Sequence, residues 1–323
     1  MMKSKIILRK QADYRLEDIV AFVRDTVAIH SATAPLFRSG DRVLLKPNLL
    51  RASKPEQCVV THPKVVEAVC IVLNDLGVKR IDIADSPALG SPQQVARKAG
   101  YGLLEKRYGV CLTSLTRPTA METLEQIPHL KIAGSLNDYD QIVNLPKVKS
   151  HCQMTLTLAI KNLFGVVIGK RKPILHCLVQ NDKVKFGRLI VEIARKVAPG
   201  ITIVDGITAM QGNGPINGTP YPLGLLIGGT DLTAIDRVIA NILQVPEEQV
   251  YALTAASQLK YGAQSLEQIE LMGVTDLGTL RVTDFELAHR KMDISFNPAR
   301  IVKSFFKQFI EIAFKEKFAK DIH

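Results

Sequence analysis

The sequence predicts an α/β fold in which helices cover both faces of a mainly parallel sheet. Short apolar runs alternate with segments of helical spacing, and polar motifs directly follow several of the apolar runs. No linker of low complexity divides the chain. We therefore expect one α/β body over residues 1–290, with two lobes around a central cleft and a lobe boundary near residue 200, and an amphipathic helix over residues 291–323.

The first third of the chain alternates between expected strands and expected helices. The strands are Lys5–Arg9, Arg42–Lys46 and Ile81–Ala84, and the helices are Arg15–Ala28 and Pro63–Leu76. Pro47 ends the second strand, which therefore delivers Lys46 and Asn48 at its carboxyl end. Thr61 or His62 lies near the cap of the second helix, whose first turn tolerates proline.

The stretch from Asn144 to His176 is densely cationic and predicts a site. Its basic residues are Lys147, Lys149, His151, Lys161, Lys170, Arg171, Lys172 and His176. We expect a strand over Gln141–Leu145, then a loop, then a helix over Thr155–Phe164 that stops at Gly165. Lys161 has apolar neighbours on both sides, and a half-buried ammonium needs an anionic partner from the protein or from a ligand. Lys170, Arg171 and Lys172 are expected to form a solvated face.

Beyond residue 200 the alternation continues. The expected strands are Ile201–Val204, Pro222–Gly228 and Gly273–Asp284, and the expected helices are Thr230–Leu243 and Glu247–Leu259. A glycine-rich loop begins at Asp205, and its backbone N–H groups can face an anion; a connection without a ligand is the alternative. The helix over 291–323 carries an apolar stripe that favours docking on the parent domain or on a second copy in a homodimer, with an anionic lipid surface as the alternative.

Composition narrows the class of partner. A chain of 323 residues with 46% hydrophobic side chains and a mean hydropathy of +0.10 can bury a large core. The formal net charge of +11 favours anionic partners, such as phosphorylated or carboxylated metabolites, nucleic acid or an acidic membrane surface. The sequence contains no tryptophan, aromatic–basic repeat or zinc-finger spacing, which argues against specific nucleic-acid recognition.

The five cysteines include no C-x-x-C pair, so the sequence predicts neither a disulfide framework nor a self-contained iron–sulfur cluster. Reduced cytoplasmic thiols are the simple interpretation. The N-terminus lacks a secretory apolar segment, and no run of about 18 apolar residues occurs. We expect a cytoplasmic protein without a transmembrane span.

Candidate binding residues follow the expected strands or lie in the cationic stretch. They are Lys46, Asn48, Asp85, Lys147, Lys149, Asn162, Asp205, Gly212 and Gly214. Lysines at strand ends would hold an anionic substrate or cofactor as point charges. The two aspartates can bind a metal ion, orient a histidine or accept from a substrate hydroxyl, and an Asx turn or helix cap is the alternative for each.

His62, His151 and Lys161 are the candidate catalytic residues. Imidazole titrates near neutrality, so His62 or His151 would exchange a proton while Lys161 anchors or polarises the ligand. These roles predict an isomerase, lyase or oxidoreductase step on a carboxylate or a phosphate ester. A non-catalytic binding protein for an anionic metabolite or a metal is the alternative, and so is a nucleic-acid-binding protein.

The motifs VLLKPNLL, THP, IADSPALG, NLPKVKSH, AIKNLFGVVIGK, IVDGITAMQGNGP and GGTDLTAID resemble those of domain-of-unknown-function family 362. They appear in matching order over roughly residues 40 to 265. Many members of that family carry a ferredoxin-type module or are labelled iron–sulfur proteins, so an iron–sulfur-linked electron-transfer partner is a further alternative, although electron transfer cannot be inferred from the resemblance. This chain lacks the cysteine clusters, so the resemblance implies no cluster of its own.

A second resemblance concerns His151, Lys161 and His176, which lie ten and fifteen residues apart. This spacing is similar to that of nickel-pincer lactate racemases, in which a lysine holds a pyridinium-derived cofactor and a histidine ligates nickel. The resemblance implies that Lys161 anchors a cofactor or substrate, that His176 is a metal ligand for nickel, iron or zinc, and that His62 and His151 move protons. The glycine-rich context of that family's lysine is not reproduced here.

Overall fold

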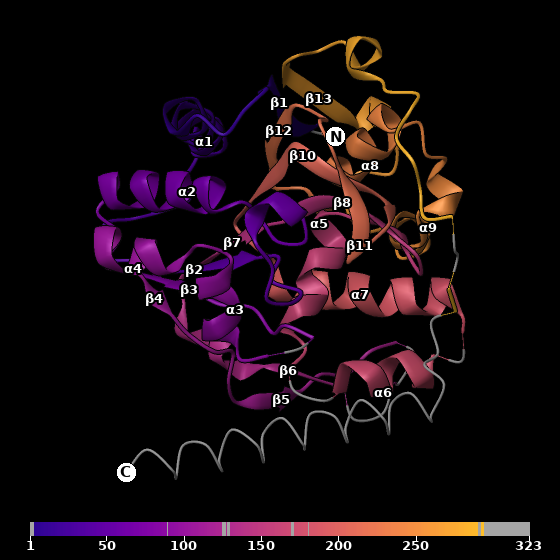
Figure 1. Cartoon of the computed structure of the whole chain (residues 1–323), viewed down its shortest axis with the longest axis horizontal. Helices are drawn as coiled ribbons and strands as arrows, with labels where there is room; N and C mark the ends of the chain where they lie inside the picture. Colours follow the sequence, from indigo (N-terminus) through magenta and orange to yellow (C-terminus); the bar gives the residue numbers. More distant parts are fainter. Residues whose placement is uncertain are drawn as a thin grey trace.

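The computed structural model describes residues 3–88, 90–124, 127, 130–168, 171–179, 181–289 and 292–293, and Figure 1 shows the whole arrangement. Of the helix expected over 291–323, only residues 292 and 293 are described, so its docking and a homodimer through it lie outside the described residues.

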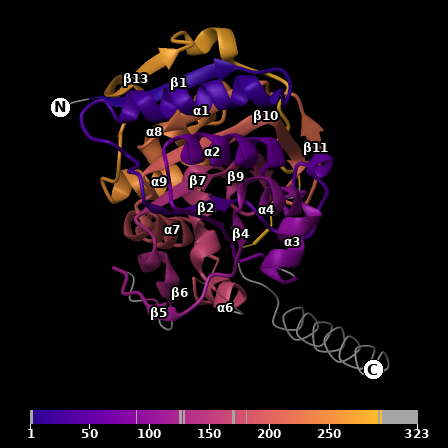
Figure 2. The same ribbon diagram turned by 90° about the vertical axis from the view of Figure 1, so that its left-hand side faces the viewer.

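A single sheet runs through the molecule in the order β13-β1-β12-β10-β7-β2-β3-β4. These strands are β1 (Ser4–Lys10), β2 (Arg42–Pro47), β3 (Arg80–Ile83), β4 (Cys111–Leu112), β7 (Gln141–Leu145), β10 (Ile201–Asn213), β12 (Leu225–Gly229) and β13 (Ile269–Gly273). From β10 to β4 every pair is parallel, while β12 is antiparallel to both β10 and β1. The predicted mainly parallel sheet is confirmed. Figure 2 shows β13 beside β1, which joins the two ends of the described chain.

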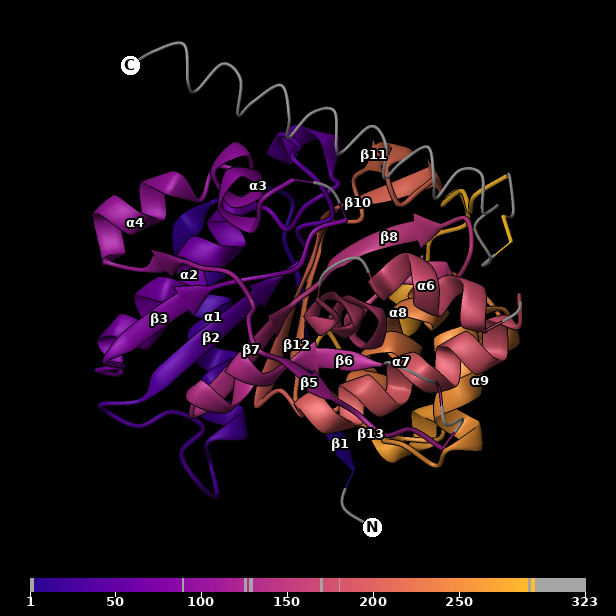
Figure 3. The ribbon, with the colours of Figure 1, turned by 90° about the horizontal axis from the view of Figure 1, so that it is seen from below.

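Helices cover both faces of this sheet, as predicted, and Figure 3 shows the two groups on opposite sides. One face carries α1 (Leu16–His30), α2 (Pro63–Asp75), α3 (Pro92–Lys98) and α4 (Gly102–Tyr108), and the other carries α5 (Ala159–Asn162), α6 (Arg171–Leu178), α7 (Lys183–Val197), α8 (Leu232–Ile242) and α9 (Tyr251–Gln258). Successive side chains of β1 point to opposite faces of the sheet and so contribute to both hydrophobic cores. Ile6 and Leu8 pack on one face, and Ile7 packs on the other.

The segment after β7 differs from the prediction. The expected loop is strand β8 (Lys147–His151), which pairs in parallel with β10 and antiparallel with β9 (Thr155–Thr157). The expected helix over Thr155–Phe164 is therefore wrong in its first half. It begins only at Ala159, because Asp236 of α8 accepts from the backbone N–H groups of Ala159 and Ile160 at 2.7 and 3.2 Å, and it continues as a 3₁₀ turn over Leu163–Val166.

The glycine-rich loop expected after Val204 is also wrong. Strand β10 continues to Asn213 and forms an antiparallel hairpin with β11 (Asn217–Tyr221). Gly214 allows this hairpin to approach β8, because a Cβ at that position would overlap the carbonyl oxygen of Ser150. The lobe boundary expected near residue 200 falls just before β10, which pairs with β7 on one side and β12 on the other.

Two segments later in the chain also differ from the prediction. The strand expected over Gly273–Asp284 is wrong, because β13 ends at Gly273 and Leu277–Leu280 form a 3₁₀ turn that Asp276 caps by accepting from Gly278 N–H. The helix expected over Glu247–Leu259 is divided into a 3₁₀ turn at Glu247–Gln249 and helix α9. The remaining strands β5 (Pro118–Ala120) and β6 (Lys131–Ala133) form a separate antiparallel pair.

Candidate functional site

The carboxyl ends of neighbouring strands bring most of the predicted residues together. Lys46 is the penultimate residue of β2, and Asp85 follows β3. Lys147 and Lys149 lie on β8, and Asp205 lies in β10. In an open parallel sheet this edge is the expected ligand site. The residues divide into two groups with opposite charge balance.

The first group is a closed ion pair between Lys147 and Asp205, both fully buried. The Lys147 ammonium donates to Asp205 Oδ2 at 2.8 Å and to the Tyr14 hydroxyl oxygen at 2.9 Å, while Tyr14 donates to Asp205 Oδ1 at 2.9 Å. Burial alone would lower the pKa of Lys147, but attraction to Asp205 raises it above the ordinary lysine value. Charge is balanced in this pair, which leaves no reason for it to bind an anion.

His62 belongs to the same network and caps helix α2, as one of the two predicted caps. The ring Nδ1 of His62 accepts from the backbone N–H of Lys64 at 3.2 Å, and the backbone N–H of His62 donates to Asp205 Oδ2 at 2.8 Å. The ring stacks on that of Tyr14, with centroids 3.5 Å apart. Burial lowers the pKa of His62 to about 4. The ring is therefore neutral at pH 7 with Nδ1 already used, and any proton exchange by His62 would have to use Nε2.

The second group, here called the lysine cluster, consists of Lys46, Lys149, Lys161 and Lys172 around Asp85. Lys46 pairs with Asp85 Oδ1 at 2.9 Å and is fully buried. The remaining Asp85 contacts are backbone N–H groups, those of Leu49 at 2.8 Å and Ser86 at 2.9 Å. One carboxylate thus faces four lysines, and Lys46 already neutralises it.

Lys149 is fully buried and donates to Asn48 Oδ1 at 2.7 Å and to the carbonyl oxygen of Val59 at 2.8 Å. Neither acceptor carries a formal charge. Burial, with repulsion from Lys147 and Lys161, lowers the pKa of Lys149 to about 7. At pH 7 the Lys149 amine is therefore near half protonation, and a bound anion nearby would raise the protonated fraction.

Lys161, in the last turn of α5, is half-buried. Among the described residues its ammonium has no hydrogen bond or ion pair, and it lies 4.8 Å from the ring centroid of Phe164 and 5.8 Å from that of Phe186. Burial, with repulsion from Lys172 and Lys46, lowers its pKa to about 7. The described protein does not supply the anionic partner that the sequence leads us to expect for Lys161.

The solvated face expected at Lys172 is wrong, because this side chain is half-buried and donates to the carbonyl oxygen of Ser86. Burial lowers its pKa to about 8. Its neighbour Lys170 and the side chain of Arg171 lie outside the described residues.

Three amides next to the lysine cluster form a hydrogen-bonded chain, called here the asparagine chain. Asn48 Nδ2 donates to Asn162 Oδ1 at 2.9 Å, Asn162 Nδ2 donates to Asn144 Oδ1 at 2.8 Å, and Asn144 Nδ2 donates to the carbonyl oxygen of Ala159 at 3.1 Å. The chain therefore runs from Lys149 on β8 to the first residue of α5. Asn144 and Tyr14 are missing from the residues predicted from sequence. The polar Asn144 inside an apolar strand was a usable signal, whereas nothing around Tyr14 marked it.

His151 and His176 are the two remaining histidines of the predicted site. His151 is 8% exposed, and its Nδ1 accepts from the N–H groups of Gln153 at 3.0 Å and Met154 at 3.2 Å. Burial, with repulsion from Lys161 and Lys149, holds the pKa of His151 well below its ordinary value. His176 packs against the ring of Phe186 at 4.5 Å between centroids.

Within the part of the chain that the structure describes, no group of three or more His, Cys, Asp or Glu side chains is arranged to hold a metal ion. The described residues therefore do not form such a metal centre by themselves. His176 as a metal ligand stays a prediction.

The predicted anion-facing N–H groups of Gly212 and Gly214 have partners within the protein. Gly212 N–H donates to the carbonyl oxygen of Glu286 at 2.8 Å, and Gly214 N–H donates to that of Gly212 at 2.8 Å. The Gly214 bond therefore lies within the β10–β11 hairpin, and the Gly212 bond connects this hairpin to the segment at Glu286.

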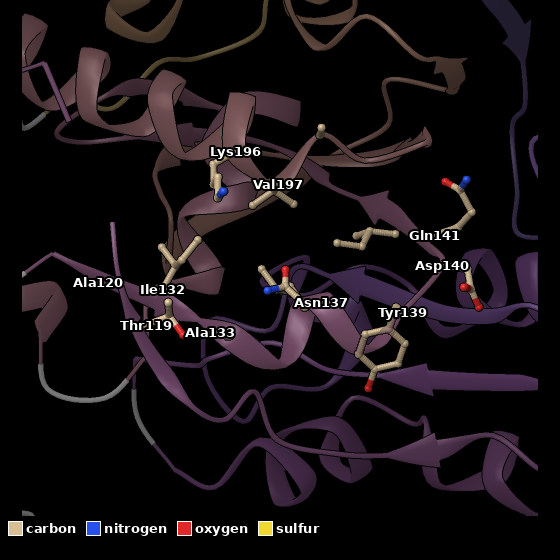
Figure 4. Close-up of a pocket in the computed structure, with 14 residues that line it drawn as sticks. Thr119, Ala120, Ile132, Ala133, Asn137, Tyr139, Asp140, Gln141, Lys196 and Val197 are labelled. Atoms are coloured by element: carbon tan, nitrogen blue, oxygen red, sulfur yellow. The ribbon is translucent and has the colours of Figure 1, made fainter. Parts of the chain in front are cut away.

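A cavity of about 300 Å³ lies elsewhere, at the amino end of β7. Figure 4 shows Asn137, Tyr139, Asp140 and Lys196 among the residues that line it. None of the lining residues belongs to the lysine cluster or to the predicted site. Its lining combines one lysine with one aspartate and neutral groups, so it lacks the charge excess that distinguishes the lysine cluster.

The chain is similar in sequence to a known family. Residues 43–241 match the model of a family described as "Domain of unknown function (DUF362)". The chain belongs to this family. A thylakoid-associated protein of Synechocystis sp. is 35% identical over 309 residues, which cover 96% of this chain and 95% of the relative. No helix in the described ranges is long and apolar enough to cross a membrane.

Among solved structures, the lactate racemase apoprotein from Thermoanaerobacterium thermosaccharolyticum is similar, with a TM-score of 0.41 and 16% identity. The match covers 70% of this chain and 54% of the racemase chain, so this chain spans about half the racemase's length. A similarity this low supports no inference about ligand or reaction in this chain.

Proposed function

We propose that this protein binds a small anionic molecule, a carboxylate or a phosphate ester, in the lysine cluster and acts on it there. The charge imbalance around Asp85 is the observation that carries the proposal. Lys149, Lys161 and Lys172 have no carboxylate of their own among the described residues, and Lys46 already pairs with Asp85. Buried cations without counter-charges are costly, and a bound anion would relieve that cost.

The roles within the site follow from each side chain's contacts. Lys161 would anchor or polarise the ligand because no described group competes for its ammonium. His151 would exchange a proton through Nε2, because its Nδ1 accepts from two backbone N–H groups. Such an exchange would make the reaction an isomerase, lyase or oxidoreductase step. A bound metal ion would need ligands in addition to the described His, Cys, Asp and Glu side chains, which form no group of three or more that could hold one.

A non-catalytic binding protein is the second candidate, and His62 favours it. The His62 ring is occupied as a helix cap and stacks on Tyr14, so a structural role already accounts for it. Alanine at His151 would then leave ligand binding intact, and no turnover would be found. In either case we propose that the protein works in a reducing, cytoplasmic setting. The Synechocystis relative is named as thylakoid-associated, so cell fractionation should also test whether this protein associates with thylakoids.

Calorimetric titration with inorganic phosphate and with oxalate tests the binding site. We expect wild-type protein to bind at least one of these anions at pH 7, with Lys149→Met and Lys161→Met each weakening binding about tenfold or more. Lys79→Met is the matched control, since Lys79 is an exposed lysine on another part of the surface. Affinity should fall as pH rises from 7 to 9, because the cluster lysines lose their protons. Equal binding by wild type and Lys161→Met would reject the proposed site.

A further inference from the structure

We infer that Lys161 is an amine nucleophile that forms an imine with an anionic carbonyl compound held in the lysine cluster. The inference deepens the proposed function and rests on it, because the cluster must first bind the anionic group. The class of ligand is an aldehyde or ketone that carries a carboxylate or a phosphate a few bonds from the carbonyl carbon.

Geometry selects Lys161 from the four lysines. Lys46 is held by the Asp85 carboxylate, Lys149 by Asn48 and Val59, and Lys172 by the Ser86 carbonyl. Among the described residues, Lys161 alone in the cluster has neither a hydrogen bond nor an ion pair, and it is only half-buried. An attacking amine needs an unshared electron pair and an approach path, and this side chain meets both needs best.

The surroundings favour the neutral amine. The rings of Phe164 and Phe186 lie beside the Lys161 nitrogen, and neighbouring ammonium groups repel a further positive charge. With its pKa lowered to about 7, about half of the Lys161 side chains are unprotonated at neutral pH. Desolvation next to other cations is a known way to activate a lysine.

The reaction balances without an oxidant or a reductant. The Lys161 nitrogen attacks the carbonyl carbon, a C–N bond forms as the C=O π bond breaks, and the extra proton on nitrogen passes to the oxygen to give a carbinolamine. The carbinolamine hydroxyl takes a second proton from a neighbouring ammonium such as Lys149 or Lys172 and leaves as water, while the nitrogen lone pair forms the C=N bond of a protonated imine. Return of the remaining N–H proton to the neighbouring amine gives the neutral imine. The same ammonium groups would hold the ligand's carboxylate or phosphate.

Reductive trapping tests this inference with glyoxylate and sodium cyanoborohydride, read by intact-mass and peptide mass spectrometry. Reduction of the imine leaves a carboxymethyl group on the reacting lysine. At pH 7 we expect Lys161 to be labelled about 100-fold faster than Lys79 in the same molecule, because a far larger fraction of Lys161 is unprotonated. Lys161→Arg should abolish this fast labelling, and its urea unfolding curve shows whether the variant is folded.

Two further arms separate the possible failures. Acetaldehyde is the neutral control and should label Lys161 at least tenfold more slowly than glyoxylate, and inorganic phosphate should protect against glyoxylate. If phosphate binds by calorimetry but Lys161 reacts no faster than Lys79, the imine inference is overturned and the anion site stands. If acetaldehyde labels Lys161 as fast as glyoxylate, the inferred ligand class is wrong. Absence of both phosphate binding and fast labelling would overturn both proposals.

Discussion

Lys147 and Lys149 lie two residues apart on β8 and are equally buried, yet their pKa values shift in opposite directions. Lys147 has Asp205 at 2.8 Å and its pKa is raised, whereas Lys149 donates only to uncharged oxygens and its pKa is lowered to about 7. Residues at i and i+2 on a strand face the same side, so the difference does not come from orientation. The counter-charge therefore decides whether the pKa of a buried lysine on this strand is raised or lowered.

Removing the counter-charge from the closed pair should have the largest effect on stability. Asp205→Asn leaves Lys147 buried without a carboxylate, and we expect the free energy of unfolding to fall by about 3–5 kcal/mol in urea titrations. The double variant Lys147→Met/Asp205→Asn should recover part of this loss, because it no longer buries a lone charge. A loss below about 1 kcal/mol for the single variant would show that the pair is not what distinguishes Lys147 from Lys149.

Steric pressure on the other carboxylate should have the next largest effect. Gly165 lies against the Lys46–Asp85 pair, and a Cβ there would overlap Asp85 Oδ1. We expect Gly165→Ala to lower the free energy of unfolding by about 1–3 kcal/mol and to weaken phosphate binding. Gly102→Ala is the matched control, because its Cβ would make only an ordinary contact with Arg97, at 3.5 Å. Similar stability of the two variants would mean that the pair can shift freely.

The lowered lysine pKa values predict how stability depends on pH. Lys149 and Lys161 have folded-state pKa values of about 7 against an ordinary value of 10.5, so between pH 7 and 10 the unfolded chain binds more protons than the folded chain. The free energy of unfolding should therefore rise with pH in this window, by up to about 1.4 kcal/mol per pH unit for each lysine. Lys149→Met should remove its share of the slope, whereas Lys79→Met should not. Parallel pH profiles for wild type and Lys149→Met would contradict the lowered pKa.

The cap at helix α2 should have the smallest effect and separates a structural from a catalytic role for His62. His62→Ala should cost about 1 kcal/mol because Lys64 N–H loses its acceptor. Asparagine can also cap, so His62→Asn should restore most of this stability. Once a substrate is identified, turnover by His62→Asn at the wild-type rate would confine His62 to capping, while a large loss of turnover at normal stability would assign it a proton-transfer role.

Local patterns predicted much of the fold, and tertiary contacts explain where they failed. The apolar run of β7 and the helical spacing of α1 were sufficient signals. Strand β8 was not predicted, because Lys147, Lys149 and Ser150 are typical of a polar loop when their partners are unknown. These partners are Asp205, Asn48 and the carbonyl oxygen of Gly212, all distant in sequence. Similarly, the start of α5 depends on Asp236, which lies far along the chain and leaves no local signal.

The sequence also indicated which candidate residues lie near the sheet edge, but not how they are grouped there. Strand ends placed Lys46, Asp85 and Asp205 at one edge of the sheet. Which lysine pairs with which aspartate depends on register and on side-chain packing between distant segments, so the difference between the closed pair and the lysine cluster required the structure.

The asparagine chain has a consequence for the cost of binding. Every amide in it donates in the same direction, and its first donor is Lys149, which retains N–H bonds as an ammonium and as a neutral amine. A change of protonation at Lys149 therefore requires no amide to turn over. This wall of the proposed site would therefore need no rearrangement of its amides on anion binding, so little binding free energy would be lost to their reorganisation.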